Sequence, residues 1–165
     1  MKAKNEIEIP EGLNISIESN SITISGPKGK VTKMLPSTVK LEGRKIMISS
    51  DSTERMNTTL ALIKSAMKGV QEGYSKKMKI VFAHFPITIE VKGKEIYIKN
   101  FLGEKVPRVA SIVGDTTVKP EKEFITLIGP DAYALGQTIA NIKTATKIRQ
   151  KDPRVFQDGL YEISE

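Results

Sequence analysis

The chain has 165 residues, 39% hydrophobic and 27% charged, a composition typical of a folded protein rather than a disordered one. Its net charge of +7 favours an anionic partner, either nucleic acid or an acidic membrane surface. Cysteine is absent and His84 is the single histidine, which excludes disulfides, Cys-based zinc sites and thiol nucleophiles. No apolar run is long enough to span a bilayer and no signal sequence is recognisable, so we expect a cytoplasmic protein without a membrane partner.

Apolar and polar residues alternate in the first part of the chain, which predicts β-strands. Residues 14–25 form one predicted hairpin and residues 39–48 a second, with a loop at 26–30 between them. The period then changes, because apolar residues recur at steps of four and three from Met56 to Val70. That spacing is typical of a helix that packs on a sheet.

The same order of elements begins again after residue 75. The second copy would contain a hairpin over 87–98, a loop over 100–105, strands near 109–113 and 124–128, and a helix that carries Leu135, Ile139 and Ile142. The order of strands first and helix last favours an antiparallel α+β plan over a wound parallel sheet.

The two halves can be superposed position by position. An offset of 74 pairs Ile22 with Ile96, Ile24 with Ile98, Gly29 with Gly103 and Val39 with Val113. An offset of 79 pairs Ile46 with Ile125, Ile48 with Leu127, Thr59 with Thr138, Ile63 with Ile142 and Lys64 with Lys143. The five extra residues would lie at a hairpin tip near 119–123. We predict an α+β fold of two tandem copies, residues 1–80 and 81–165, each a small antiparallel sheet covered by one helix.

Residues 141–161 are unusually basic, with five cations within twelve residues: Lys143, Lys147, Arg149, Lys151 and Arg154. Lys143, Lys147 and Lys151 recur every four residues and would share one face if the helix continued. We interpret this stretch as a helix end and tail that the fold presents to the phosphates and shape of RNA. The alternative is a solvated helix end with a frayed tail. Phe156 and Tyr161 could stack on bases or dock the tail on the body.

No group of residues indicates an enzyme, a cofactor or a metal site. Residues 26–30, GPKGK, resemble a phosphate-binding loop only in composition, since the required spacing and the Gly-Lys-Ser/Thr ending are missing. His84 has no implied Ser, Cys or carboxylate partner, so we expect a packed, hydrogen-bonded histidine rather than a catalytic base. We therefore predict a protein without enzymatic activity, cofactor or small-molecule substrate.

Several longer motifs resemble those of one family, the large-subunit ribosomal protein "L six" family in its archaeal and eukaryotic form. They are IPEG (9–12), GPKG (26–29), GVQEGY (69–74), KMKI (77–80), AHFPI (83–87), NFLGEK (100–105) and KDPRVFQDG (151–159). The motifs occur in order over essentially the whole chain, which makes the resemblance much more specific than any one of them.

The resemblance implies a duplicated fold, no catalysis and binding to large-subunit ribosomal RNA near the sarcin-ricin loop and the stalk base. Neighbouring ribosomal proteins would be partners, and translational GTPases would dock nearby. By analogy, three segments of the second copy would contact RNA: the loop with Lys99, Asn100, Gly103, Lys105 and Arg108, the helix end with Lys143, Lys147 and Arg149, and the tail with Lys151, Arg154 and Gln157. Residues 62–66, LIKSA, depart from the family pattern, so no contact is carried over to the first helix.

Net charge and local clustering point to different halves of the chain. Residues 1–80 hold 14 Lys and Arg against 8 Asp and Glu, a net of +6, whereas residues 81–165 hold 12 against 11, a net of +1. We favour the second half, because phosphate contacts depend on local geometry. The alternative function is a non-ribosomal protein–protein adaptor built from two β-rich repeats.

Overall fold

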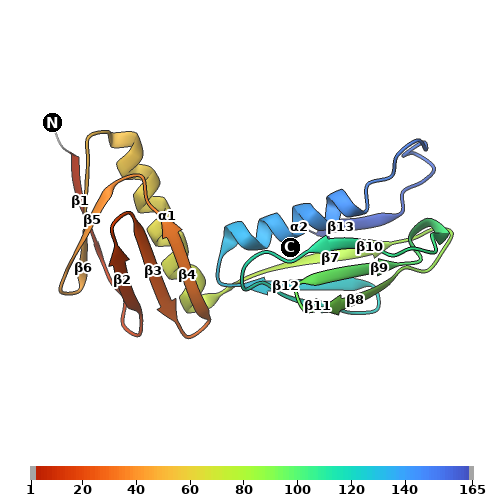
Figure 1. The fold of residues 1–165 in the computed structure, drawn as a ribbon, viewed down its shortest axis with the longest axis horizontal. Coiled ribbons are helices and arrows are strands. Elements are labelled where there is room, and N and C mark those ends of the chain that lie inside the picture. The colour runs from red at the N-terminus through yellow and green to blue at the C-terminus, as the bar shows by residue number, and fades with distance from the viewer. Residues whose placement is uncertain (1–2, 164–165) are drawn as a thin grey trace. The chain divides into compact units, whose positions relative to one another are not determined.

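The computed structural model describes residues 3–163, which form an α+β protein with two compact units, as predicted (Figure 1). The first unit extends to Gly73 and the second begins at Tyr74, while residues 130–132 group with the first. This boundary differs from the expected one between residues 80 and 81, because residues 74–81 form a central strand of a sheet in the second unit. None of the described helices is long and apolar enough to cross a membrane.

The first unit contains two three-stranded antiparallel sheets and one helix, whereas one sheet was expected. Its elements are β1 (Ala3–Glu8), β2 (Asn14–Glu18), β3 (Ser21–Gly26), β4 (Gly29–Met34), β5 (Thr38–Glu42), β6 (Lys45–Ser50) and α1 (Thr53–Glu72). The strand orders are β1-β6-β5 and β2-β3-β4. Pro36, which has no N–H to donate, lies in the connection between β4 and β5 where the chain leaves one sheet for the other.

The second unit repeats this plan and adds a strand. Its elements are β7 (Tyr74–Val81), β8 (Thr88–Lys92), β9 (Glu95–Lys99), the 3-10 turn η1 (Phe101–Gly103), β10 (Arg108–Ser111), β11 (Thr117–Pro120), β12 (Phe124–Gly129), α2 (Ala132–Ala145) and β13 (Gly159–Ile163). Strands β10-β9-β8 form one sheet and β11-β12-β7-β13 the other. β13 pairs antiparallel with β7, so the end of the described chain is part of a sheet rather than a frayed tail.

The two cores correspond residue by residue. Ile22, Ile24, Ile46, Ile48 and Ile63 are fully buried in the first unit, and so are their counterparts Ile96, Ile98, Ile125, Leu127 and Ile142 in the second. Thr59 and Thr138 are also fully buried. Each donates its hydroxyl to the carbonyl four residues earlier, at 2.8 Å in both helices, so the polar group is satisfied within the helix. The duplication therefore includes a buried polar position as well as the apolar ones.

The five extra residues of the second unit do not lie at 119–123. Ile24 faces Val31 in the first unit and Ile98 faces Arg108 in the second, so the offset has already grown from 74 to 77 between β9 and β10. Val39 faces Ile48 and Val118 faces Leu127, which gives an offset of 79 at β11. The counterpart of Val39 is therefore Val118, and the pairing with Val113 was wrong. Three extra residues lie in the β9–β10 loop and two between β10 and β11.

Candidate nucleic-acid interface

Three segments of the second unit gather at one end of its sheets (Figure 1). They are the β7–β8 connection (82–87), the β9–β10 loop (100–107) and the connection from α2 to β13 (146–158), and we call them together the basic end. The β9–β10 loop contains the three-residue insertion, and in the first unit α1 is followed at once by Gly73 and β7. Two of the three segments of the basic end, the longer β9–β10 loop and the connection beyond α2, thus have no equivalent of the same length in the first unit.

The β9–β10 loop is shaped by left-handed backbone positions and is held against the core and the β7–β8 connection. Asn100 adopts the left-handed conformation (φ 59°) and donates its side-chain amide to the Pro86 carbonyl at 3.0 Å. Phe101 is fully buried in the core of the unit. Gly103 has φ 73°, and a Cβ at this position would lie 3.0 Å from the ring of Phe85. Asn100 and Gly103 therefore shape the loop, and Lys105 is exposed on it.

Arg108, at the start of β10, connects this loop to the end of α2. Its Nε and Nη2 donate to the two carboxylate oxygens of Glu104 at 3.0 and 2.7 Å. Its Nη1 donates to the carbonyls of Ala145 and Lys147, both at 3.0 Å. The guanidinium carbon also lies 4.6 Å from the centre of the Phe101 ring. This bidentate bond lowers the pKa of Glu104 and raises that of Arg108.

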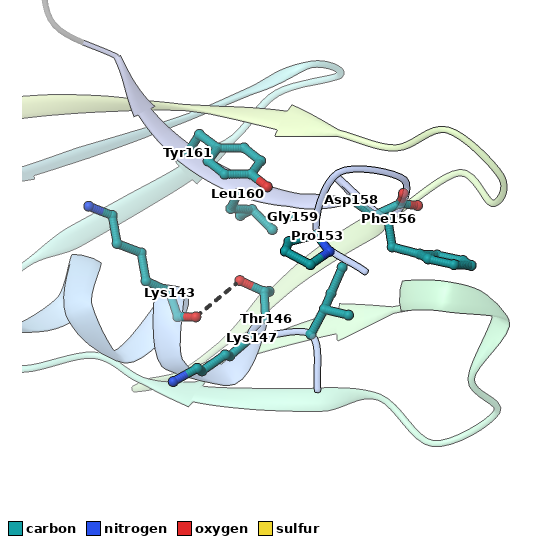
Figure 2. Close-up of a pocket in the computed structure, with 10 residues that line it drawn as sticks. Lys143, Thr146, Lys147, Pro153, Phe156, Asp158, Gly159, Leu160 and Tyr161 are labelled. Atoms are coloured by element: carbon teal, nitrogen blue, oxygen red, sulfur yellow. Dashed lines mark hydrogen bonds between the residues drawn. The ribbon is translucent and has the colours of Figure 1, made fainter. Parts of the chain in front are cut away.

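Helix α2 ends at Ala145, so the predicted continuous basic face is wrong. Lys143 lies in the last turn, whereas Lys147 and Lys151 lie beyond the helix. The buried Thr146 donates its hydroxyl to the Ile142 carbonyl at 3.0 Å. The same hydroxyl lies 3.5 Å from the Lys143 carbonyl (Figure 2). The Ile142 carbonyl also accepts the Thr146 backbone N–H at 3.0 Å, so the hydroxyl adds a second bond at the end of the helix.

The connection to β13 is anchored to the β7–β8 segment. Asp158 is buried, and one of its carboxylate oxygens accepts a bond from the Ala83 N–H at 3.3 Å. Phe156 is half-buried, with the His84 ring 5.4 Å away and Lys151 Nζ 4.7 Å from its centre. His84 is exposed, so the expected packed, hydrogen-bonded histidine is wrong. Its sequence neighbours Ala83 and Phe85 are exposed as well, so this part of the β7–β8 connection lies at the surface rather than in the core.

Two pockets open at the basic end. One, of about 400 Å³, lies between the β9–β10 loop and the chain beyond α2, and Glu104, Arg108, Lys147, Arg149 and Lys151 contribute to its wall. The other, of about 420 Å³, lies between α2 and the connection to β13 (Figure 2). Lys143 and Lys147 line the second pocket, with Phe156 on the far side from their ammonium groups. Lys147 therefore borders both.

Several of the predicted cations already have carboxylate partners. Lys143 pairs with Glu162 at 3.1 Å, Arg154 with Asp152 at 3.0 Å, and Lys99 with Glu90. These lysine and arginine bonds lower the pKa of Glu162, Asp152 and Glu90. All these pairs lie at the surface, where an ion pair contributes little to stability.

The remaining predicted residues are exposed. Within residues 3–163, Lys105, Lys147, Arg149 and Lys151 form no ion pair. Gln157 is also exposed and donates its amide to the Arg154 carbonyl at 3.2 Å. The structure thus brings Arg108, Lys147, Arg149 and Lys151 to one pocket, while Lys99 and Arg154 are engaged elsewhere.

Sequence reasoning missed Glu104 and Phe85. Glu104 lies four residues before Arg108, a spacing that could have indicated a local ion pair. Phe85 is 45% exposed and touches the inserted loop near Gly103. Its place in the AHFPI motif is the one sequence signal that could have indicated a functional role. No group of three or more His, Asp or Glu side chains that could hold a metal ion occurs in the part of the chain that the structure describes.

The fold and this surface define a class: a duplicated α+β protein whose second copy carries exposed, uncompensated cations. Comparison with known proteins identifies the family to which the chain belongs. The family model of ribosomal protein L6 matches residues 85–159, which include the whole inserted loop and most of the basic end.

Relatives that match over nearly the whole chain belong to the same family. The chain is 42% identical to large ribosomal subunit protein uL6 of Methanosarcina mazei over 95% of this chain and 94% of that protein. It is 41% identical to the protein of the same name from Methanocella arvoryzae (96% and 95%) and from Methanobrevibacter smithii (98% and 95%). The chain belongs to the ribosomal protein L6 family, a family of structural ribosomal proteins rather than enzymes. The predicted family and its archaeal type are confirmed.

Proposed function

We propose that this protein is a structural constituent of the large ribosomal subunit that binds ribosomal RNA through the basic end of its second unit. Family membership supports the ribosomal role and the binding of ribosomal RNA and neighbouring ribosomal proteins in general. The observation that supports this particular surface is the group of exposed cations without ion pairs: Lys105, Lys147 and Arg149, together with Lys151. A phosphate brought to them would displace counterions without first breaking an internal ion pair.

The surface combines a hydrogen-bonded backbone with charged groups that are exposed to solvent. Loop 100–107 and the chain beyond α2 are held by Arg108, Asp158 and Thr146, whereas the ammonium and guanidinium groups extend into solvent. Such a surface fits the phosphates of a folded RNA and carries no base-edge code of its own. Lys99 and Arg154 would contact RNA only by sharing or exchanging their carboxylate partners, so we assign them a smaller part of the affinity.

The location that we propose is near the sarcin-ricin loop and the stalk base, in the region where translational GTPases dock. The family resemblance supports this location. Chemical probing of large-subunit ribosomal RNA with and without the protein tests it. We expect protection at the sarcin-ricin loop and the stalk base. Protection elsewhere would overturn the location, and no protection at any nucleotide would overturn RNA binding itself.

A further inference from the structure

We propose that Arg108 is a positioning residue of the RNA surface, which fixes the inserted loop against the end of α2, and that it is not itself a phosphate ligand. This inference rests on the proposed function. Arg108 then differs from the RNA contact expected from the family resemblance, and Glu104 takes a role as its partner.

The donors of Arg108 are already committed. A guanidinium has five N–H donors, and Arg108 uses Nε, Nη1 and Nη2 in four bonds of 2.7–3.0 Å. One face of the group lies over the Phe101 ring at 4.6 Å. Its side chain is 25% exposed, against 88% for Arg154. Four of the five donors are therefore engaged, and a phosphate could take more than the one remaining Nη2–H only by displacing bonds that hold the loop.

The acceptors of Arg108 explain what these bonds do. The last carbonyls of a helix lack partners within the helix and form its negative end. Arg108 Nη1 binds two carbonyls at this point, those of Ala145 and Lys147, while the rest of the guanidinium binds the loop residue Glu104. The residues so fixed are Lys105 on one side and Lys147 and Arg149 on the other. Arg108 thus sets the distance between the two halves of the cationic surface.

The first unit has no equivalent of the Arg108 contact. In strand register, Arg108 faces Ile98 as Val31 faces Ile24, so its counterpart in the first unit is Val31. Val31 is a buried apolar residue, and the β3–β4 connection beside it has only two residues, Pro27 and Lys28. The second unit has an arginine where the first has a core valine, at the position where its loop is longer.

Glu104 makes the inference testable. It lines the basic pocket, and a carboxylate there would repel RNA phosphates if charge alone mattered. The positioning role predicts the opposite, because Glu104 holds Arg108. Glu104→Gln raises the net charge by one yet should weaken binding to large-subunit ribosomal RNA about fivefold, since the neutral amide loses the bidentate charged bond. Glu121→Gln, at the exposed β11–β12 turn, is the matched control with the same change of charge and should not weaken binding.

A second measurement does not depend on RNA. In the free protein, Glu104→Gln, Arg108→Ala and Arg108→Lys should each accelerate hydrogen exchange over residues 101–105 and 146–149, because lysine cannot form the fork that arginine forms. Glu121→Gln should leave exchange there unchanged. Equal or tighter RNA binding by Glu104→Gln, or unchanged exchange in all three variants, would overturn the positioning role. Failure of the wild-type protein to bind ribosomal RNA would instead overturn the proposed function. The hydrogen-exchange measurement would then be the test of whether Arg108 positions the loop.

Discussion

The sharpest test of the cationic surface is the double substitution Lys147→Ala and Arg149→Ala. Both side chains are exposed, lie beyond the end of α2 and form no ion pair in the described chain. They differ in this from Lys143 and Arg154, whose removal would also leave a carboxylate without its partner. The double variant therefore removes two of the proposed phosphate contacts without leaving a carboxylate unpaired.

The size of the effect follows from counterion release. Each lost phosphate contact should reduce the slope of log affinity against log salt by roughly 0.7–0.9, so two contacts reduce it by about 1.6. Over a fourfold rise in salt, from about 50 to 200 mM, the ratio of wild-type to variant affinity should then shrink about ninefold. The unfolding free energy should change by less than about 0.5 kcal/mol, because neither side chain packs in the core.

Filter binding to large-subunit ribosomal RNA over this salt range measures the slope. The control is Lys64→Ala with Lys68→Ala, which removes the same two charges from exposed positions on α1. We expect the control to keep the wild-type slope. Equal slopes for the two double variants would refute the reasoning, because net charge rather than this surface would then carry the binding.

Three further predictions concern stability. Ile142→Ala should lower the unfolding free energy by about 2–5 kcal/mol in denaturant titration, since the side chain is fully buried, and a change below about 1 kcal/mol would contradict its place in the core. Gly103→Ala should lower the melting temperature, because φ 73° is strained for alanine and its Cβ would meet the Phe85 ring; an unchanged temperature would show that the loop relaxes. Arg108 lowers the pKa of Glu104, so the stabilisation is present above the ordinary carboxyl pKa and lost as pH falls through the lowered value. The difference in unfolding free energy between wild type and Glu104→Gln should be constant above about pH 5 and should diminish as the pH falls below about 4. A difference that stays constant at lower pH would contradict the role of the Glu104 carboxylate.

The sequence predicted those features of the fold that depend on the spacing of apolar residues along a single element. Alternation located the hairpins, the four-and-three spacing located both helices, and the match of Thr59 with Thr138 identified the duplication, because each of these patterns follows from neighbours along one element. The family motifs likewise identified the family. These parts of the account needed no contact between distant residues.

What could not be predicted depends on contacts between distant segments. β13 forms because it pairs with the edge of β7, some 80 positions earlier in the chain. No local pattern in residues 159–163 predicts this pairing. Lysines spaced by four suggested a continuous helical face, but α2 ends at Ala145 with Arg108, 37 residues away, on its carbonyl. The insertion was misplaced for a similar reason, since the offset between copies is set by strand register, and Val118 matches the apolar pattern no better than Val113.

The most direct test of the central claim uses the absence of cysteine from the sequence. Lys105→Cys, Arg149→Cys and, as a control, Lys64→Cys each give one attachment point for an iron–EDTA group, which cleaves nearby RNA through hydroxyl radicals. Bound to large-subunit ribosomal RNA, the groups at 105 and 149 should cut overlapping sets of nucleotides, because these residues flank one surface, and the group at 64 should not cut there. Cleavage of those nucleotides from position 64, with none from 105 and 149, would contradict the claim that the basic end of the second unit holds the RNA.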